Sequence, residues 1–248
     1  MEVHAHDLHK APGNGWKHYI FEFLMLFLAV FCGFLAENFR EHQVEKEREE
    51  IFIKNLVEDL KQDTVVFNKN MSYNAVLLEK DDSLINLLNS PDVKFFGSAL
   101  YYMGRLSSRS TPLAINDATI QQLKNSGGFR LIQNEDVAIK ILEYYNRLVF
   151  ISYLQQVETF ESEDYRKIAV EVFDPLIFNS IASHTGNYIA RPPGNPQLLT
   201  YDQQVLRRLS GTVAYHKSAK FAISEAQSDM KKAAIKLIEL IESDYHLQ

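Results

Sequence analysis

An uninterrupted apolar stretch near the N-terminus, from Tyr19 to Ala36, limits how this chain can fold. It reads YIFEFLMLFLAVFCGFLA, and Glu22 is its only formally charged residue. As an α-helix rising ~1.5 Å per residue, the stretch covers roughly 27 Å, which is close to the thickness of the hydrocarbon core of a bilayer. Trp16 and its neighbours form an interfacial belt before it, and polar residues follow from Glu37 onward. The pattern predicts a transmembrane helix over residues 16–38.

A cleaved signal peptide is the alternative interpretation of this stretch. A signal peptide ends in a small-residue cleavage pattern, which is not found here, and polar helical sequence continues directly after Ala36. We therefore expect a retained single-pass anchor, preceded by a mobile tail over residues 1–15. Membrane lipid is then a predicted partner of the chain.

One face of the predicted helix combines small residues with Glu22 and with Arg40, which follows the span. Its members follow helical spacing of three and four and are Glu22, Leu26, Ala29, Gly33, Ala36 and Arg40. Small residues at such spacing let helix backbones approach closely, which drives helix association in lipid, where burying apolar side chains gives no net gain. We expect Glu22, Ala29, Gly33, Ala36 and Arg40 to form a membrane helix-packing face, used by a homo-oligomer or with other membrane-protein subunits.

Three interpretations of Glu22 stay open at this point. Because it lies one turn inside the span, it can sit in the headgroup layer beside His18. It can also face a partner helix. An ion or proton pathway is the third interpretation, since ionisable residues within membrane segments often mark such pathways.

The side of the membrane on which the soluble part lies is only weakly indicated. Lys10 and Lys17 precede the span and four basic residues follow it, which taken alone would retain the soluble part in the cytoplasm. However, five glutamates are interleaved with those four residues. The single cysteine, Cys32, lies in the span, and a cysteine-free soluble part fits an oxidising compartment slightly better. We expect a periplasmic soluble domain.

Composition and motifs bear on the class of function. A formal charge of −6 without a basic cluster argues against nucleic-acid binding, and 46% hydrophobic residues suffice for a folded core. The sequence has no phosphate-binding glycine loop, zinc-protease histidine pair or nucleophile elbow. We therefore assign no catalytic residue, no cofactor and no metal, and expect a non-enzymatic protein. His4, His6 and His9 are expected to belong to a solvated tail, and His184 and His216 to be structural.

Beyond the span, the sequence predicts a charged helical stalk over residues 39–50 and a soluble helical domain over residues 51–248. A first helix carries apolar residues from Phe52 onward and is expected to end near Asn89. A second helix is expected over residues 93–106, weakened by Gly97 and Gly104, and the connector SSRSTPLAIN follows it.

The middle of the domain is expected to contain further helices. Asn116 is predicted to cap the short helix DATIQQLKNS, which the Gly127 and Gly128 pair ends. Asn134 starts the next helix, which has two apolar stripes and is therefore expected to be central and buried. The first stripe is Val137, Ile141, Tyr144, Leu148 and Ile151, and the second is Ile139, Leu142, Val149 and Tyr153.

The last part of the chain predicts its longest soluble helix. A further helix over residues 163–183 is expected to be interrupted at Pro175, and residues 184–197 are expected to form a loop. Thr200 and Gln203 match a capping box, and apolar residues keep helical spacing from Leu206 to Ile241. This helix can lie antiparallel to the first one. The predicted fold is all-α, an elongated helical bundle.

Two segments resemble an uncharacterised family of bacterial single-span membrane proteins. The first is HYIFEFLMLFLAVFCGFLAENFREH with the acidic and basic stalk that follows it, and the second is ATIQQLKNSGGFRLIQNEDVAIKILEYYN; together they cover about a third of the chain. The shared pattern is a glutamate early in the span, a polar exit, and a Leu, SerGly, LeuIle, Asn and TyrTyr block. It falls here on Glu22, Glu37, Asn38, Arg40, Glu41, Leu123, Ser126, Gly127, Leu131, Ile132, Asn134, Tyr144 and Tyr145. The resemblance implies the topology of a bacterial inner-membrane protein and no particular chemistry.

The block around the two tyrosines has two physical interpretations. It can be a structural corner, where the glycine pair reverses the chain and Asn134 starts a helix whose tyrosines enter the core. It can also line a groove for a ligand or partner, with Arg130, Tyr144 and Tyr145 on its walls. The functional hypotheses are accordingly a non-enzymatic membrane component that assembles through its span and stalk, and a membrane-anchored sensor or binding module.

Overall fold

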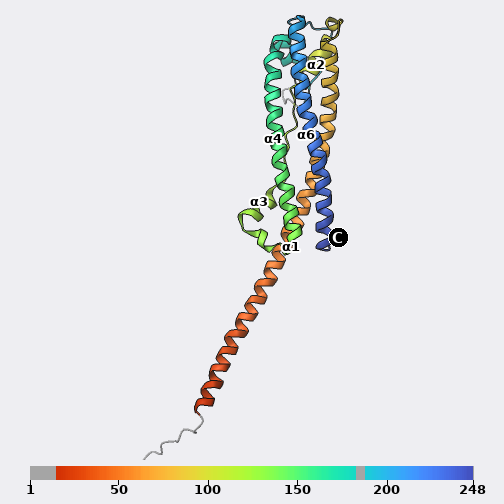
Figure 1. The fold of residues 1–248 in the computed structure, drawn as a ribbon. Coiled ribbons are helices and arrows are strands. Elements are labelled where there is room, and N and C mark those ends of the chain that lie inside the picture. The colour runs from red at the N-terminus through yellow and green to blue at the C-terminus, as the bar shows by residue number, and fades with distance from the viewer. Residues whose placement is uncertain (1–14, 183–187, 248) are drawn as a thin grey trace, which may run out of the picture. The chain divides into compact units, whose positions relative to one another are not determined.

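The computed structural model describes residues 15–182 and 188–247 (Figure 1). The expectations for the tail, His4, His6, His9 and His184 lie outside these residues. The helices are α1 (Gly15–Leu88), α2 (Gly97–Ser107), α3 (Ala118–Asn125), α4 (Glu135–Val172), α5 (Pro175–Ile181) and α6 (Gln203–Asp244), with 3-10 turns at Val93–Phe95 and Gly128–Leu131. The described residues form no strand beyond one isolated bridge between Ala182 and Ile189. The predicted all-α fold is confirmed.

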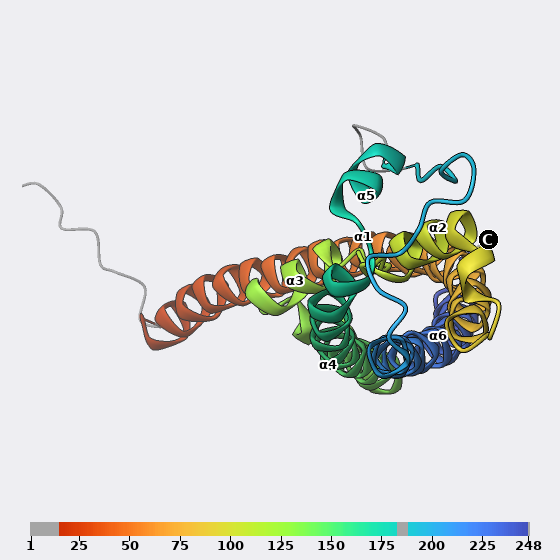
Figure 2. The same cartoon turned by 90° about the horizontal axis from the view of Figure 1, so that it is seen from above.

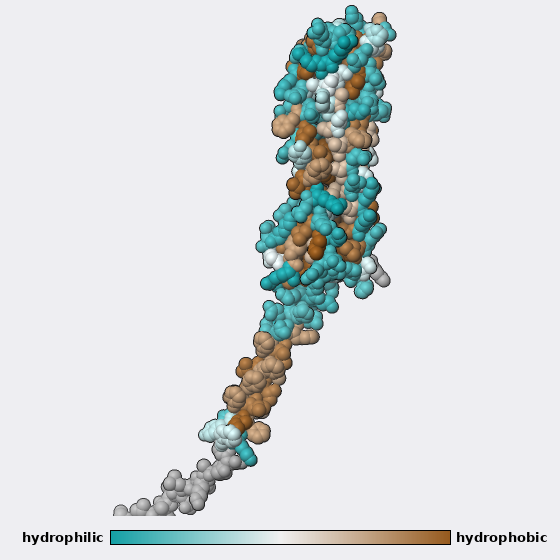
Figure 3. All heavy atoms as spheres, viewed as in Figure 1, coloured by the Kyte–Doolittle hydropathy of each residue, from teal (hydrophilic) through white to brown (hydrophobic). Residues whose placement is uncertain are grey.

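The first of two compact units ends at Ile51 and contains the N-terminal part of α1. This part holds an 18-residue window that is long and apolar enough to cross a membrane, and none of that window is buried. Figure 3 shows it as a continuous hydrophobic band followed by hydrophilic residues. Phe23, Phe27 and Phe31 form a stacked row along it, with ring centroids 6.3 and 5.9 Å apart.

The second unit, Phe52–Gln248, is a bundle of three long helices: α1 from Phe52 onward, α4 and α6. Two hydrogen bonds show the relative direction of α1 and α6: Asn74 bonds Ser224 at 3.2 Å, and Asn89, directly after α1, bonds the earlier residue Ser210 at 2.8 Å. The two helices are therefore antiparallel, as the sequence predicts. Figures 1 and 2 show α4 and α6 side by side, and they too are antiparallel.

Because α1 and α4 run in the same direction, the chain has to return along the bundle between them. The short helix α2, the extended connector and α3 make this return. Gln155 of α4 donates to the Thr111 carbonyl of the connector at 3.3 Å, and Thr111 donates to Asn74 of α1 at 3.1 Å. The connector is thus bonded to both helices that it links.

Two apolar clusters fill the bundle. The first lies between the early part of α1 in this unit, the first half of α4 and the end of α6, and includes Ile53, Leu56, Leu60, Phe67, Ile141, Leu148, Ile151, Leu237 and Ile241. The second lies at the other end, and includes Leu84, Leu88, Leu100, Tyr101, Tyr165, Phe173, Leu206, Leu209 and Val213.

The predicted starts of two helices need correction. Asn116 is not the cap of α3, because its backbone N–H and its amide bond to Asp63 and Gln62 of α1. Instead Asp59 of α1 accepts from Thr119 N at 3.3 Å, in the first turn of α3. The N-cap of α6 is Asp202, whose carboxylate accepts from Gln204 N and Val205 N, while Thr200 bonds Asp202 N.

The prediction that α4 is buried on two sides is wrong. Its first stripe is buried, but in the second stripe Ile139 is 50% exposed and Val149 is 69% exposed. The helix is also longer than predicted, since it continues without interruption to Val172, past the start predicted at Glu163. By contrast, Asn134 caps it as expected, accepting from Asp136 N and Val137 N.

The second predicted helix is also divided, because a 3-10 turn precedes α2 and Phe96 separates them. Its two glycines are required by packing. A Cβ atom on Gly97 would lie 1.9 Å from the carbonyl oxygen of Pro196, and one on Gly104 would lie 2.6 Å from the Phe173 ring. Glycine is expected to weaken the helix at these two positions, but any residue with a side chain would prevent the close contacts with Pro196 and Phe173.

We expect Gly97→Ala to lower the free energy of unfolding by about 1–3 kcal/mol, because the backbone around Pro196 has to move. Gly211→Ala is the matched control, since its Cβ would meet nothing within 4 Å in the interior of α6. The control should raise stability by up to about 1 kcal/mol. Urea unfolding of the full-length variants in mild detergent, followed by circular dichroism, measures both. Equal effects of the two substitutions would contradict the packing argument.

Candidate functional site

The predicted packing face of the span lies on the N-terminal part of α1 and is fully exposed in the single chain. A Cβ atom on Gly33 would meet nothing within 4 Å. Glu22 has no ion-pair partner among the described residues, whereas Arg40 forms two hydrogen bonds with Glu37 of its own helix, at 3.0 and 2.5 Å. The small residues are therefore free to contact another helix.

In the second unit, Tyr144 connects α4 to α1 and to the connector. Its hydroxyl donates to Asp63 Oδ2 at 2.9 Å, and Asn116 N donates to Asp63 Oδ1 at 3.0 Å. The Tyr144 and Tyr145 rings meet edge to face with centroids 5.1 Å apart. Both tyrosines are buried, so they form a corner that fixes the chain before α3.

Burial dominates the protonation of this corner. It raises the pKa of Asp63 from 3.8 to about 6, although the hydrogen bonds from Asn116 and Tyr144 lower it. Burial and the neighbouring Asp63 carboxylate also raise the pKa of the Tyr144 hydroxyl. At neutral pH the site is therefore a buried carboxylate held by two donors.

The three residues predicted to line a groove are only partly brought together. Tyr144 and Tyr145 are adjacent, but the Tyr145 hydroxyl is buried without a hydrogen-bond partner among the described residues. Arg130 lies on the 3-10 turn Gly128–Leu131 and is exposed. It does not line the groove that includes Tyr144.

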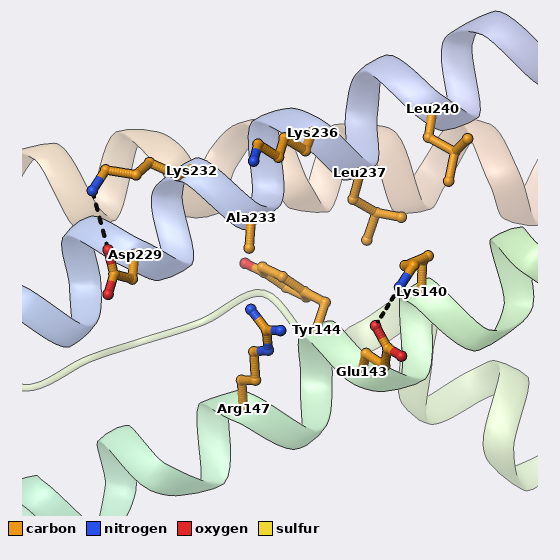
Figure 4. A pocket seen from close by; sticks show the side chains of 10 residues that line it. All are labelled: Lys140, Glu143, Tyr144, Arg147, Asp229, Lys232, Ala233, Lys236, Leu237 and Leu240. Carbon is orange, nitrogen blue, oxygen red and sulfur yellow. Dashed lines mark hydrogen bonds and ion pairs between the residues drawn. The ribbon is translucent and has the colours of Figure 1, made fainter.

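That groove lies between α4 and α6 and has a volume of about 530 Å³. Figure 4 shows Tyr144 and Arg147 pointing into it from α4, and Leu237 from α6. Its lining residues are Lys140, Glu143, Tyr144, Arg147, Asp229, Lys232, Ala233, Lys236, Leu237 and Leu240. The groove thus combines an aromatic and aliphatic floor with a charged rim.

The charges of the rim do not balance. Lys140 is paired with Glu143 at 2.8 Å, and Lys232 with Asp229 at 3.1 Å. Arg147 and Lys236 have no ion-pair partner among the described residues. The rim therefore carries two more cations than anions, in a chain whose net charge is −6, and this excess favours an anionic group in the groove.

Neither Arg147 nor Lys236 is among the site residues predicted from the sequence. Their signal is the helical spacing of Lys140, Glu143 and Arg147 on one helix and of Lys232 and Lys236 on another, next to apolar positions. Such spacing is also typical of an ordinary solvated face. Only the pairing of α4 with α6 brings the two sets together.

A polar layer separates the two apolar clusters in the interior of the bundle. Lys220 is fully buried and donates to Asp81 Oδ2 and to the Ser107 carbonyl, each at 3.0 Å. His216, expected to be structural, lies in this layer with its Nε2 3.7 Å from Glu158 Oε1. The buried polar residues of the layer are Asn74, Asp81, Ser107, Thr111, Glu158, Ser162, His216, Lys220 and Gln227.

Several atoms of the polar layer have no hydrogen-bond partner among the described residues: Asp81 Oδ1, Ser107 Oγ, Ser162 Oγ, both ring nitrogens of His216 and both amide atoms of Gln227. Unpaired polar groups in a protein interior are costly. The layer is therefore a part of the core where polar groups outnumber the hydrogen bonds that the helices supply.

Comparison of the chain with protein-family models, with curated proteins and with solved structures finds no match. Within the residues that the structure describes, no group of three or more His, Cys, Asp or Glu side chains has the arrangement of a metal site.

The raised pKa of Asp63 predicts a pH-dependent stability. Because the folded state holds this proton more tightly than the unfolded state, the contribution of Asp63 to the free energy of unfolding is greatest below pH 4 and falls as the pH rises to about 6. In Asp63→Asn this fall should disappear. The free energy of unfolding of Asp63→Asn minus that of wild type should therefore rise by roughly 1–2 kcal/mol between pH 4 and pH 7, after allowance for solvent screening.

Urea unfolding at several pH values measures this difference, with Glu58→Gln, an exposed acid on the same helix, as control. A pH-independent difference for Asp63→Asn would show that the folded and unfolded states bind this proton equally.

Proposed function

We propose that this chain is a non-enzymatic, single-pass protein of the bacterial inner membrane, anchored by residues 16–38, with its helical domain in the periplasm. The observation that carries the proposal is the exposed apolar stretch Tyr19–Ala36, none of whose residues is covered by the rest of the chain. Exposing so many large apolar side chains to water is unfavourable, and a bilayer removes them from it. The likeness of two segments to bacterial single-span proteins agrees with this topology.

We further propose that the protein assembles through its span and stalk, with itself or as an accessory subunit of an envelope complex. Close approach of two helices in lipid requires small residues on the contacting face. The face with Ala29, Gly33 and Ala36 meets this requirement, and a Cβ atom on Gly33 would meet nothing within 4 Å.

Native mass spectrometry of the full-length protein in mild detergent tests this assembly. We expect wild type to be an oligomer and Gly33→Leu to raise its dissociation constant at least tenfold, as measured over a series of protein concentrations, because the leucine separates the helices. Phe31→Leu, a change to an exposed residue on another face of the same helix, should leave the distribution unchanged. Identical distributions of oligomers for wild type and Gly33→Leu would contradict the proposed packing face. Recovery of the protein from the aqueous fraction without detergent would contradict the proposed membrane anchor.

A second candidate function is a membrane-anchored binding module, and the groove between α4 and α6 favours it. Arg147 and Lys236, which form no ion pair among the described residues, line the groove with the Tyr144 ring, and Leu237 and Leu240 supply apolar surface. This combination suits a small amphiphilic anion, whose charged group lies by Arg147 and Lys236 and whose apolar part lies on the leucines.

We expect hexyl phosphate to bind the full-length protein, and the double variant Arg147→Gln, Lys236→Gln to bind it at least tenfold more weakly, as measured by isothermal titration calorimetry. The double variant Lys69→Gln, Lys167→Gln removes the same charge from exposed positions outside the groove and should bind as wild type. Inorganic phosphate should bind more weakly than hexyl phosphate. Equal binding of hexanol would contradict the role of the cations.

A further inference from the structure

The outward face of α4 carries a row of large apolar side chains that the described residues leave exposed. Its large side chains are exposed by between 36% at Leu142 and 69% at Val149. They belong to the same helix as the buried stripe that runs from Val137 to Ile151, but lie on another side of it. The exposed apolar residues of this face are Ile139, Leu142, Val149, Phe150, Tyr153 and Phe160.

These residues follow a heptad pattern. Steps of three and four alternate strictly through positions 139, 142, 146, 149, 153, 156 and 160. Five of these positions are apolar or aromatic, and the other two are the exposed amides Asn146 and Gln156. Phe150 stacks beside Tyr153, with ring centroids 6.3 Å apart, and widens the apolar strip. A repeat of 3.5 residues is the spacing by which one helix packs along another in a coiled coil.

We infer that this heptad face packs against the same face of a second copy of the chain, in a parallel and in-register pair of α4 helices. In such a pair each residue meets its own equivalent, so apolar layers meet apolar layers. Asn146 meets Asn146 of the other copy, and Gln156 meets Gln156. Each amide both donates and accepts, so both polar layers are satisfied.

The two amides also select this register over its neighbours. A slip of one heptad would place Asn146 against Tyr153 and leave an amide facing a ring. A single asparagine in the seam of a coiled coil fixes register in this way, at some cost in stability. The exposed charges along residues 139–161 do not oppose the arrangement, because Lys140, Glu143, Arg147 and Glu161 each lie one position beyond a seam residue, about 100° further around the helix.

The parallel orientation rests on the proposed function. Two copies held by their spans in one membrane are related by an axis along the membrane normal, which brings equivalent residues to the same height. The contact itself does not depend on the span, because burying apolar surface from water is favourable in the soluble domain. It is therefore a second assembly surface, distinct from the face around Gly33.

Disulfide cross-linking in native membranes tests the inference. The background is Cys32→Ser, which removes the only native cysteine. We expect Phe160→Cys to form a covalent dimer on mild oxidation at least tenfold faster than Arg147→Cys, an exposed position of α4 outside the heptad face. Both proteins should react equally with a maleimide after denaturation, which controls for the amount of thiol.

Adding Gly33→Leu separates this surface from the span. Fast cross-linking of Phe160→Cys with or without Gly33→Leu supports the heptad face, whatever the result for the span. Equally slow cross-linking of the Phe160→Cys and Arg147→Cys proteins would overturn the inference. A second set of variants, made in the Gly33→Leu background so that the span face contributes less, disrupts the contact without thiols. Val149→Glu with Tyr153→Glu should raise the dissociation constant of the dimer at least tenfold, while the matched pair Val65→Glu with Tyr215→Glu, at exposed positions of α1 and α6, should not. An unchanged dissociation constant for the first pair would also overturn the inference.

Discussion

A buried ion pair at the middle of the bundle sets the register of its helices. Lys220 of α6 is fully buried, and its three-donor ammonium group reaches Asp81 of α1 and the carbonyl of Ser107 at the end of α2. Taking two charges out of water costs several kcal/mol per ion, and only good geometry offsets that cost. Moving α1 by one turn would place Lys220 against Leu77 or Leu84, both buried, and leave two unpaired charges. The apolar clusters on either side have no comparable means of resisting such a slip, so the pair supplies specificity where the leucines supply the driving force.

Buried polar contacts also explain why the groove and the heptad face both lie on α4. Asp63 and Asp59 of α1 bind the connector and the start of α3, and Tyr144 joins the same carboxylate from α4. These polar contacts fix the rotation of α4 about its own axis. With one face held on the core, a second borders α6 and forms the groove, and a third faces outward with the heptad residues. A helix of 38 residues thus presents three different surfaces because one buried tyrosine and one capping asparagine, Tyr144 and Asn134, determine how it enters the bundle.

Local patterns in the sequence predicted what depends on neighbours along the chain. The apolar stretch before Glu37, the cap at Asn134, the turn at Gly127 with its φ of 68° and the long amphipathic α6 all follow from spacing and backbone preference. The errors involve contacts between distant residues. Asn116 has the residue type of a helix cap, but its backbone N–H bonds Asp63 of α1. The requirement for Gly97 depends on Pro196, 99 positions later. The second stripe of α4 has the periodicity of a buried face, but periodicity does not indicate whether the residues that bury it belong to the same chain. The groove escaped prediction for a related reason, since Arg147 and Lys236 come together only through the pairing of two helices.

The span and the heptad face obey different physics, and their combination limits what the protein can form. In lipid, an apolar side chain gains nothing by leaving the solvent, so the contact at Gly33 depends on close approach of backbones. In water, Val149 and Phe160 gain by burial itself, and Asn146 restricts the register. If each surface pairs with the same surface of another copy, as proposed, each generates a two-fold axis. If one axis serves both surfaces, the assembly closes as a dimer with equivalent residues paired along two separate lengths of chain. If the axes differ, each copy contacts one neighbour through the span and another through α4, and the result is an open row in the plane of the membrane. The choice between a closed pair and a row is therefore set by whether Gly33 and Phe160 meet the same partner.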